Sequence, residues 1–170
     1  MPMPGHAHEH AHGHGHGPPP AGVSRPPHPP RPSPVAPSVG PAETDDQKAA
    51  DPAAREAANT WLHHLAEGNV DKLLGRTGLP FYAGLQPIAK TRDELRDILR
   101  SLSDESREAG RPKAAKMYTA AGLRKLFGSA PAGVQEGTGR VYALTKVGTE
   151  LVVLILDKRF GSWRIVGVAR

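Results

Sequence analysis

The spacing of apolar positions after residue 50 predicts a helix with one buried face. Asp51-Pro52 suits a helix start, because aspartate caps a helix and proline fits its first turn. Apolar residues then recur at intervals of three and four until Gly68, and they are Ala54, Ala58, Trp61, Leu62 and Leu65. At 100° per residue, His63 points towards solvent, whereas His64 lies at the edge of the core.

Three further segments show the apolar spacing of helices, at residues 69–75, 91–110 and 120–128. The clearest start is Thr91-Arg-Asp-Glu94, a capping box in which two side chains satisfy each other's backbone N–H groups. Glycine closes the second and third segments. The inward positions of the longest segment are Leu95, Ile98, Leu99 and Leu102.

Alternating or wholly apolar runs predict five strands. We expect the first, Leu79–Tyr82, at a sheet edge, because Pro80 cannot donate to a ladder. The others cover residues 114–118, 139–147, 150–157 and 162–169, and the last three form an antiparallel meander. Leu151–Leu156 is apolar on both faces, and its place is therefore near the centre of the sheet. Strands and helices do not alternate, so the pattern predicts an α+β fold.

The beginning of the chain differs in composition from the rest. Residues 1–42 hold thirteen of the 18 prolines and seven of the 9 histidines, but no Leu, Ile, Phe, Tyr or Trp. Such a segment cannot bury enough apolar surface to offset the entropy lost on ordering. We therefore predict a disordered His- and Pro-rich tail over residues 1–43 and one domain over residues 44–170.

Charge and composition argue against several functions. The formal net charge is +5, but basic residues are interspersed with acidic ones, and nucleic acid is not an expected partner. The absence of cysteine excludes disulfides, thiolate nucleophiles and cysteine-based metal sites. No apolar run is long enough to span a bilayer, and no secretory signal is visible. We expect a cytoplasmic protein that does not bind membranes.

Two stretches resemble the nuclear transport factor 2-like superfamily, which includes SnoaL-like and ketosteroid isomerase-like proteins. Trp61–Leu74 is similar to the opening helix pair of that family, and Asp157–Val166 is similar to its final hairpin, with a Gly-x-Trp-Arg-Ile pattern. The resemblance covers about residues 50–170. It implies a cone in which a curved antiparallel sheet wraps around the N-terminal helices, with a pocket at the open end.

The same resemblance places a pocket between the first long helix, the first strand and the inner sheet face. Its expected lining is Trp61, His64, Phe81, Tyr82, Tyr118 and Trp163. These mostly large, apolar side chains suit the binding of a small apolar molecule better than catalysis. The family's isomerase reaction needs a carboxylate base and acidic oxyanion donors. Trp61 stands at the tyrosine position, and residues 75–90 and 151–156 contain no Asp or Glu, so we expect no such catalysis.

Other functions stay open from the sequence. A dehydratase, cyclase or isomerase-type enzyme would use His64 in the pocket, without an organic cofactor. A metal-handling protein would work through alternate histidines of the tail, which suit Zn, Ni or Cu, namely His6, His8, His10, His12, His14 and His16. A protein partner is expected as readily as a small apolar molecule. A homodimer is expected in particular, because Tyr142 and Leu144 give the strand at 139–147 a second apolar face.

Overall fold

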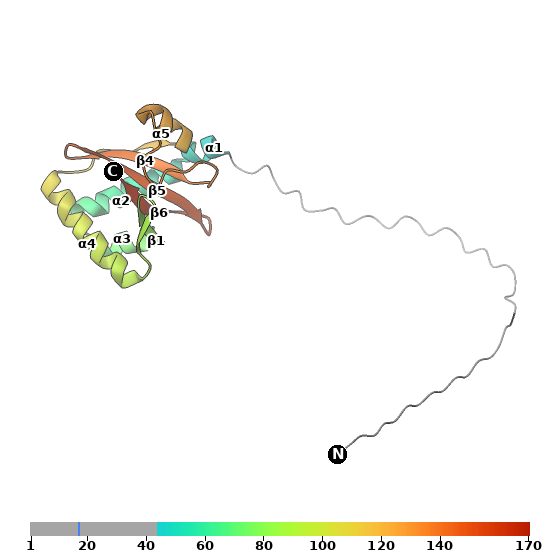
Figure 1. Ribbon diagram of the computed structural model, residues 1–170. Coiled ribbons are helices and arrows are strands. Elements are labelled where there is room, and N and C mark those ends of the chain that lie inside the picture. The colour runs from blue at the N-terminus through green and yellow to red at the C-terminus, as the bar shows by residue number, and fades with distance from the viewer. Residues whose placement is uncertain (1–16, 18–43) are drawn as a thin grey trace, which may run out of the picture. The chain divides into compact units, whose positions relative to one another are not determined.

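The computed structural model describes Gly17 and residues 44–170, and these show an α+β fold (Figure 1). A curved, unclosed sheet of six strands has the order β2-β1-β6-β5-β4-β3. Apart from Gly17, the predicted tail, with its six alternate histidines, lies outside the described residues. In the part of the chain that the structure describes, no helix has the length and apolar character needed to cross a membrane.

The elements follow one another in the order that the apolar pattern predicts, with two additions. The helices are α1 (Asp45–Ala50), α2 (Pro52–Glu67), α3 (Val70–Arg76), α4 (Arg92–Ala109) and α5 (Ala120–Phe127). The strands are β1 (Thr77–Ala83), β2 (Gln86–Ala89), β3 (Lys116–Tyr118), β4 (Val141–Val147), β5 (Glu150–Arg159) and β6 (Ser162–Ala169). The sequence pattern did not indicate α1 or β2 as separate elements.

The capping signals are confirmed. The Asp51 carboxylate accepts a hydrogen bond of 2.8 Å from the Ala53 N–H at the start of α2. Thr91 and Glu94 form the predicted capping box at the start of α4. Gly68 ends α2 in the left-handed conformation that glycine adopts without steric cost. The helix boundaries are therefore set by local side chains, as the sequence indicated.

The first strand is not at the edge of the sheet, and this prediction was wrong. β1 lies between β2 and β6, antiparallel to the first and parallel to the second, so the sheet is mixed rather than wholly antiparallel. Pro80 fits inside β1 because the pairing with β6 is irregular between Thr77 and Tyr82. The edge strand next to β1 is β2, which carries few buried residues and so gives a weak signal in the sequence.

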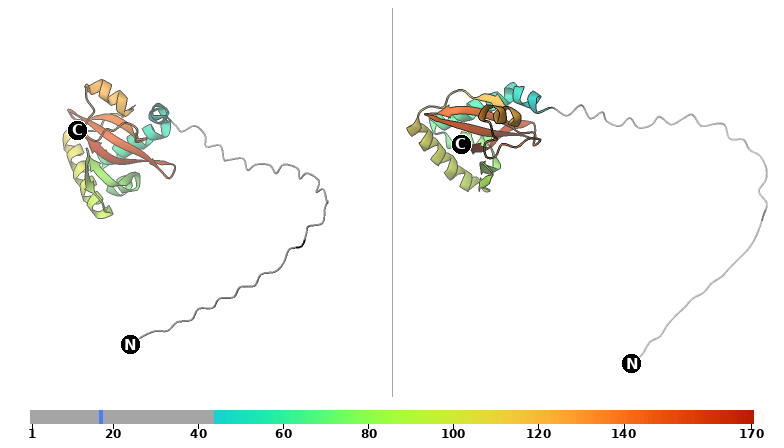
Figure 2. Two further views of the ribbon diagram at one scale, coloured as in Figure 1. Left: turned by 45° about the vertical axis from the view of Figure 1, so that its right-hand side comes forward. Right: turned by 45° about the horizontal axis from the view of Figure 1, so that its top comes forward.

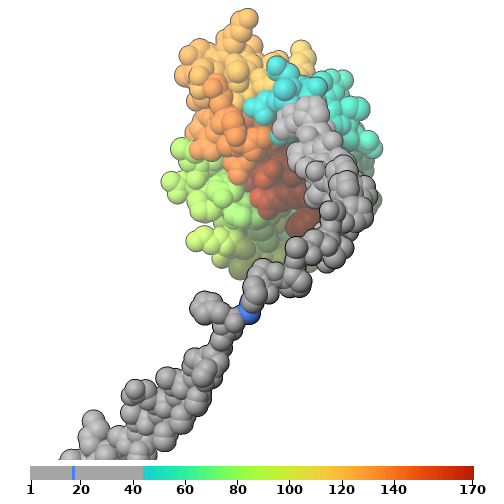
Figure 3. Space-filling model, turned by 90° about the vertical axis from the view of Figure 1, so that its right-hand side faces the viewer, coloured from blue at the N-terminus to red at the C-terminus, as the bar shows by residue number. Residues whose placement is uncertain are grey.

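The two faces of the sheet bury separate cores. One face packs on α2, α3 and α4 and contains Val141 and Ala143 of β4, whereas α5 lies over the other face (Figure 2). Figure 3 shows the C-terminal strands (red) between the segment of β1 and β2 (green) and that of β4 and α5 (orange). On the first face, α2 packs on β4, β5 and β6, and α4 packs on α2, α3 and β2.

Tyr142 is buried within its own chain. It faces the second core and is fully buried, and its hydroxyl donates to the backbone oxygen of Gln135 and accepts from the N–H of the same residue, both at 3.0 Å. Leu144 is only half-buried on this face. Tyr142 therefore gives no support for the expected homodimer, because α5 and the segment before β4 already cover its ring.

Candidate functional site

A pocket of about 430 Å³ lies between α2, α4 and the ends of β4, β5 and β6. Its walls are mostly apolar, and these residues are Trp61, Leu62, Leu65, Leu102, Ala109, Val147, Val152, Leu154 and Val168. The polar lining residues are Glu105, Ser106, Glu108, Glu150 and Arg170. A concave apolar surface with a few polar groups is the usual form of a small-molecule site.

Trp61 forms part of the wall and is fixed in place. The side chain comes from the buried face of α2 and is 1% exposed. Its indole N–H donates a hydrogen bond of 2.9 Å to the Thr77 hydroxyl, which in turn donates to the Leu73 carbonyl at 2.7 Å. Because every polar atom in this chain of contacts has a partner, the ring is held rigidly without a desolvation penalty.

Charged side chains form the rim of the pocket, and they are Glu105, Glu108, Glu150 and Arg170. The Arg170 guanidinium lies 2.7 Å from the Glu105 carboxylate of α4 and 4.0 Å from the Glu150 carboxylate of β5. Glu108 adds a third carboxylate. These pairs are more than half exposed, and such pairs contribute little to folding. Their main effect is on the charge that a ligand meets at the rim.

The turn between β4 and β5 rests directly on the end of α4. Gly148 has a positive φ of 60°, and a Cβ built on it would lie 2.4 Å from the Ala109 carbonyl oxygen. Glycine is required by the backbone conformation and by this close approach. The contact positions Val147 and Glu150 opposite α4 and so forms one side of the pocket.

Two serines on α4 carry buried hydroxyls that lack partners among the described residues. They are Ser103 and Ser106, one helical turn apart, and both are at most 3% exposed. Ser106 lines the pocket. A buried hydroxyl without a partner is unfavourable, and so a ligand that hydrogen-bonds to Ser106 would gain both affinity and orientation.

The six residues expected to line a pocket are not brought together around this one. Trp61 lines it, but Phe81 is fully buried in the core, and Tyr82 borders a separate groove with Pro80 and Pro87. Tyr118 packs against the core on the opposite sheet face. Trp163 donates its indole N–H to the Asp51 carboxylate at 2.8 Å. The indole of Trp163 thus joins the final hairpin to the start of α2.

The sequence reasoning missed the contribution of α4. It placed the pocket beside the first strand, whereas Leu102, Glu105 and Ser106 of α4 line the actual one. A usable signal was present, because these residues and Ala109 repeat at intervals of three and four on one helical face. Because that helical face combines apolar and acidic side chains, its pattern did not indicate a buried face.

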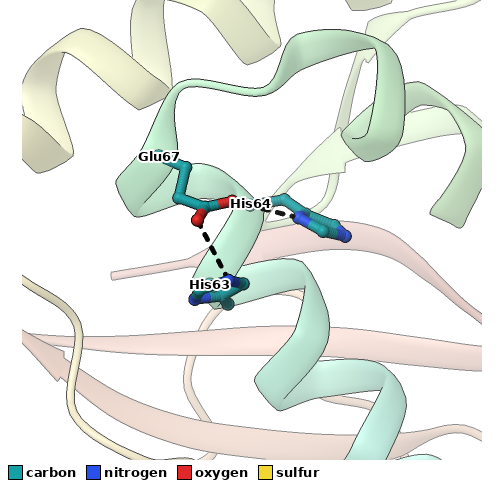
Figure 4. A group of neighbouring side chains, drawn as sticks. All are labelled: His63, His64 and Glu67. Carbon is teal, nitrogen blue, oxygen red and sulfur yellow. Dashed lines mark ion pairs between the residues drawn. The ribbon is translucent and has the colours of Figure 1, made fainter.

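His64 lies near the C-terminal end of α2, outside the lining of the pocket. It is 8% exposed, as its helical position indicates, whereas His63 is exposed. The Glu67 carboxylate stands between the two rings, 3.1 Å from Nε2 of His63 and 3.7 Å from Nδ1 of His64 (Figure 4). Burial lowers the pKa of His64, although the nearby Glu67 carboxylate opposes the shift.

Comparison with known proteins gives no identification. No family model matches this chain, and neither a curated protein nor a solved structure matches it significantly.

Proposed function

We propose that this domain binds a small amphipathic molecule in the pocket between α2, α4 and the central strands. The observation that carries the proposal is the apolar pocket of about 430 Å³. That volume falls in the range of roughly 300–1,000 Å³ that is common for small-molecule sites. The apolar tail of the ligand would contact Trp61, Leu102 and Val152, and its polar head would lie among the charged residues of the rim.

The lining favours binding over catalysis. Acid–base catalysis requires a titratable group held beside the reacting atoms, usually with a shifted pKa. The three carboxylates of the pocket are exposed side chains, and its lining contains no histidine or lysine. The Ser106 hydroxyl makes no hydrogen bond to any of these carboxylates. The alternative enzyme that uses His64 has no support from this pocket, because His64 lies outside it.

The resemblance to the nuclear transport factor 2-like superfamily supports the same proposal. That family is expected to carry its pocket inside a curved sheet wrapped on the N-terminal helices. Here α2 and α3 form the helix pair, and the sheet is curved. The pocket lies between α2 and the strands, which agrees with a cone-like arrangement. We propose membership of this superfamily on these grounds.

The rim indicates which kind of head group the ligand carries. The rim consists of three carboxylates and one guanidinium, so its net charge is negative. A cationic or neutral head group would be favoured there, and an anionic one disfavoured, since like charges repel at close range. Ser106 provides a single hydrogen-bonding group deeper in the pocket.

Calorimetric titration with decylammonium and decanoate tests this proposal. We expect saturable binding of decylammonium to one site and weaker binding of decanoate. Val152→Phe, which fills the pocket with a larger side chain, should reduce the affinity at least tenfold. Leu126→Phe is the matched control, because Leu126 is exposed on α5 and lies outside the pocket. Equal binding by both variants would show that the ligand is held elsewhere and would refute the proposal.

A further inference from the structure

We propose that His63, His64 and Glu67 form a binding site for one divalent transition-metal ion, separate from the ligand pocket. All three side chains come from the last two turns of α2. Their potential ligand atoms lie within 4.8 Å of one another, and no ion is present. Figure 4 shows the Glu67 carboxylate between the two imidazole rings.

A buried nitrogen atom without a hydrogen-bond partner gives independent evidence for a ligand at this cluster. His64 is 8% exposed, and its Nδ1 has no hydrogen-bond partner among the described residues. The atom faces Oε2 of Glu67 at 3.7 Å, which is too long for a hydrogen bond. A metal ion bound by both atoms would satisfy the buried nitrogen, which burial otherwise leaves unfavourable.

The ligand atoms are already close to the spacing that a tetrahedral ion needs. Zinc–nitrogen and zinc–oxygen bonds of about 2.0–2.2 Å place tetrahedral ligand atoms roughly 3.3–3.6 Å apart. The Glu67 oxygens lie 3.1 Å from Nε2 of His63 and 3.7 Å from Nδ1 of His64. The two distances end on different oxygens of Glu67, and the two imidazole nitrogens lie within 4.8 Å of each other, so the side chains must rotate to bring all three ligand atoms to the tetrahedral spacing. Two imidazoles and one carboxylate suit Zn(II) or Co(II) and leave a fourth position for water.

The end of α2 supports these ligands. The Gly68 and Asn69 N–H groups donate to the last carbonyls of the helix, including that of His64, and fix its final turn. The C-terminal end of a helix also carries partial negative charge, which favours a cation. In the view of Figure 4 the second ring nitrogen of His64 points away from Glu67, so Nδ1 is the atom available to the ion.

Positive charges around the site limit its affinity for a bare ion. Lys72 and Arg76 act on His64, and Arg107 donates a hydrogen bond of 2.9 Å to the Glu67 carbonyl. Arg111 and Lys113 line a neighbouring pocket together with His63 and Glu67. These cations repel a divalent metal ion, and we therefore expect a dissociation constant for the metal in the micromolar range. They would also favour hydroxide or another anion as the fourth ligand.

Zinc titration tests the site in a full-length background protein whose tail no longer competes for metal. In this background protein, alanine replaces six histidines of the tail, namely His6, His8, His10, His12, His14 and His16. Calorimetry should then show one equivalent of Zn(II) bound at neutral pH. His63→Gln and Glu67→Gln should each weaken binding at least tenfold. Both side chains are exposed, so the folded domain should persist, and melting in EDTA verifies this.

Glu56→Gln provides the matched control, because Glu56 is an exposed glutamate on α2 outside the cluster. It should bind Zn(II) as the background protein does. Zinc should also raise the melting temperature of the background protein but not that of His63→Gln. Absence of stoichiometric binding at millimolar zinc would overturn the proposal. The same holds if both ligand substitutions leave the affinity unchanged.

Discussion

Individual side chains were predicted well where their helical position decided their environment. The spacing along α2 correctly placed Trp61 in the core, His64 at its edge and His63 in solvent. It did not place Phe81 or Tyr118 correctly relative to the pocket, because their positions depend on how distant strands pair. The pattern within a segment thus predicts whether a residue is buried more reliably than it predicts which distant residues that residue contacts.

Trp61 contributes to both the core and the pocket wall, and its replacement should show this. Trp61→Ala should lower the free energy of unfolding by roughly 3–5 kcal/mol, because a large buried ring is removed. Trp61→Phe should cost less, since most of the volume remains and only the hydrogen bond to Thr77 is lost. Urea denaturation measures both. A loss below about 1 kcal/mol for Trp61→Ala would mean that the ring is not packed as described.

Asp51 should make folding stability depend on acid pH. The Trp163 indole N–H is the main cause that lowers the pKa of Asp51, and the Ala53 N–H and Lys158 add to it. A folded-state pKa below the unfolded value means stability that is present above about pH 4 and lost as the pH falls further. Asp51→Asn keeps a helix cap but removes the titration. We expect a flatter decline of unfolding free energy between about pH 5 and pH 2 in this variant.

The exposed Asp46 supplies the comparison for Asp51, because Asp46→Asn removes a carboxylate from α1 without touching Trp163. Its acid profile should follow that of the unmodified protein. If Asp51→Asn and Asp46→Asn gave the same profile, the hydrogen bond from Trp163 would have no role in acid stability.

At the scale of elements, local signals determined where helices and strands occur but not how the strands pair. Caps and glycines marked α2, α4 and α5, and alternating or wholly apolar runs marked the last three strands. The parallel contact of β1 with β6 joins segments about 85 residues apart, and nothing local encodes it. β2 was missed because three of its four residues are exposed.

The β4–β5 turn should be sensitive to a single methyl group. In Gly148→Ala the Cβ would collide with the Ala109 carbonyl in a backbone conformation that alanine disfavours. We expect a loss of roughly 1–3 kcal/mol and weaker decylammonium binding, measured by denaturation and calorimetry. Gly128→Ala is the control, since Gly128 also has positive φ but has open space around it. Equal effects in both variants would show that the contact with α4 is unimportant.

For the whole molecule, the order of helix-like and strand-like patterns predicted an α+β domain, and the described residues confirm that class. The location of the pocket was not predicted, because the pattern on α4 does not show that this helix meets the β4–β5 turn. Neither segment alone resembles a binding motif. The two apolar faces of β4 were recognised, but the cover supplied by α5 was not.

The tail should add almost nothing to the stability of the domain. It lacks the large apolar residues that form a core, and so its removal deletes no packing. A chain of residues 43–170 should melt within a few degrees of the full-length protein when no metal is present. Differential scanning calorimetry of both chains makes the comparison. A fall of ten degrees or more, on the order of several kcal/mol, would show that the domain begins earlier than Thr44.

Native mass spectrometry of the protein purified from cells tests the central claim most directly. If the pocket binds a small amphipathic molecule, the folded protein should carry an added mass of a few hundred daltons, lost on denaturation. The pocket-filling variant Val152→Phe should carry much less of it, and Leu126→Phe should retain it. A protein that carries no such mass and also fails to bind decylammonium would contradict the claim, and its pocket would then be a structural hollow.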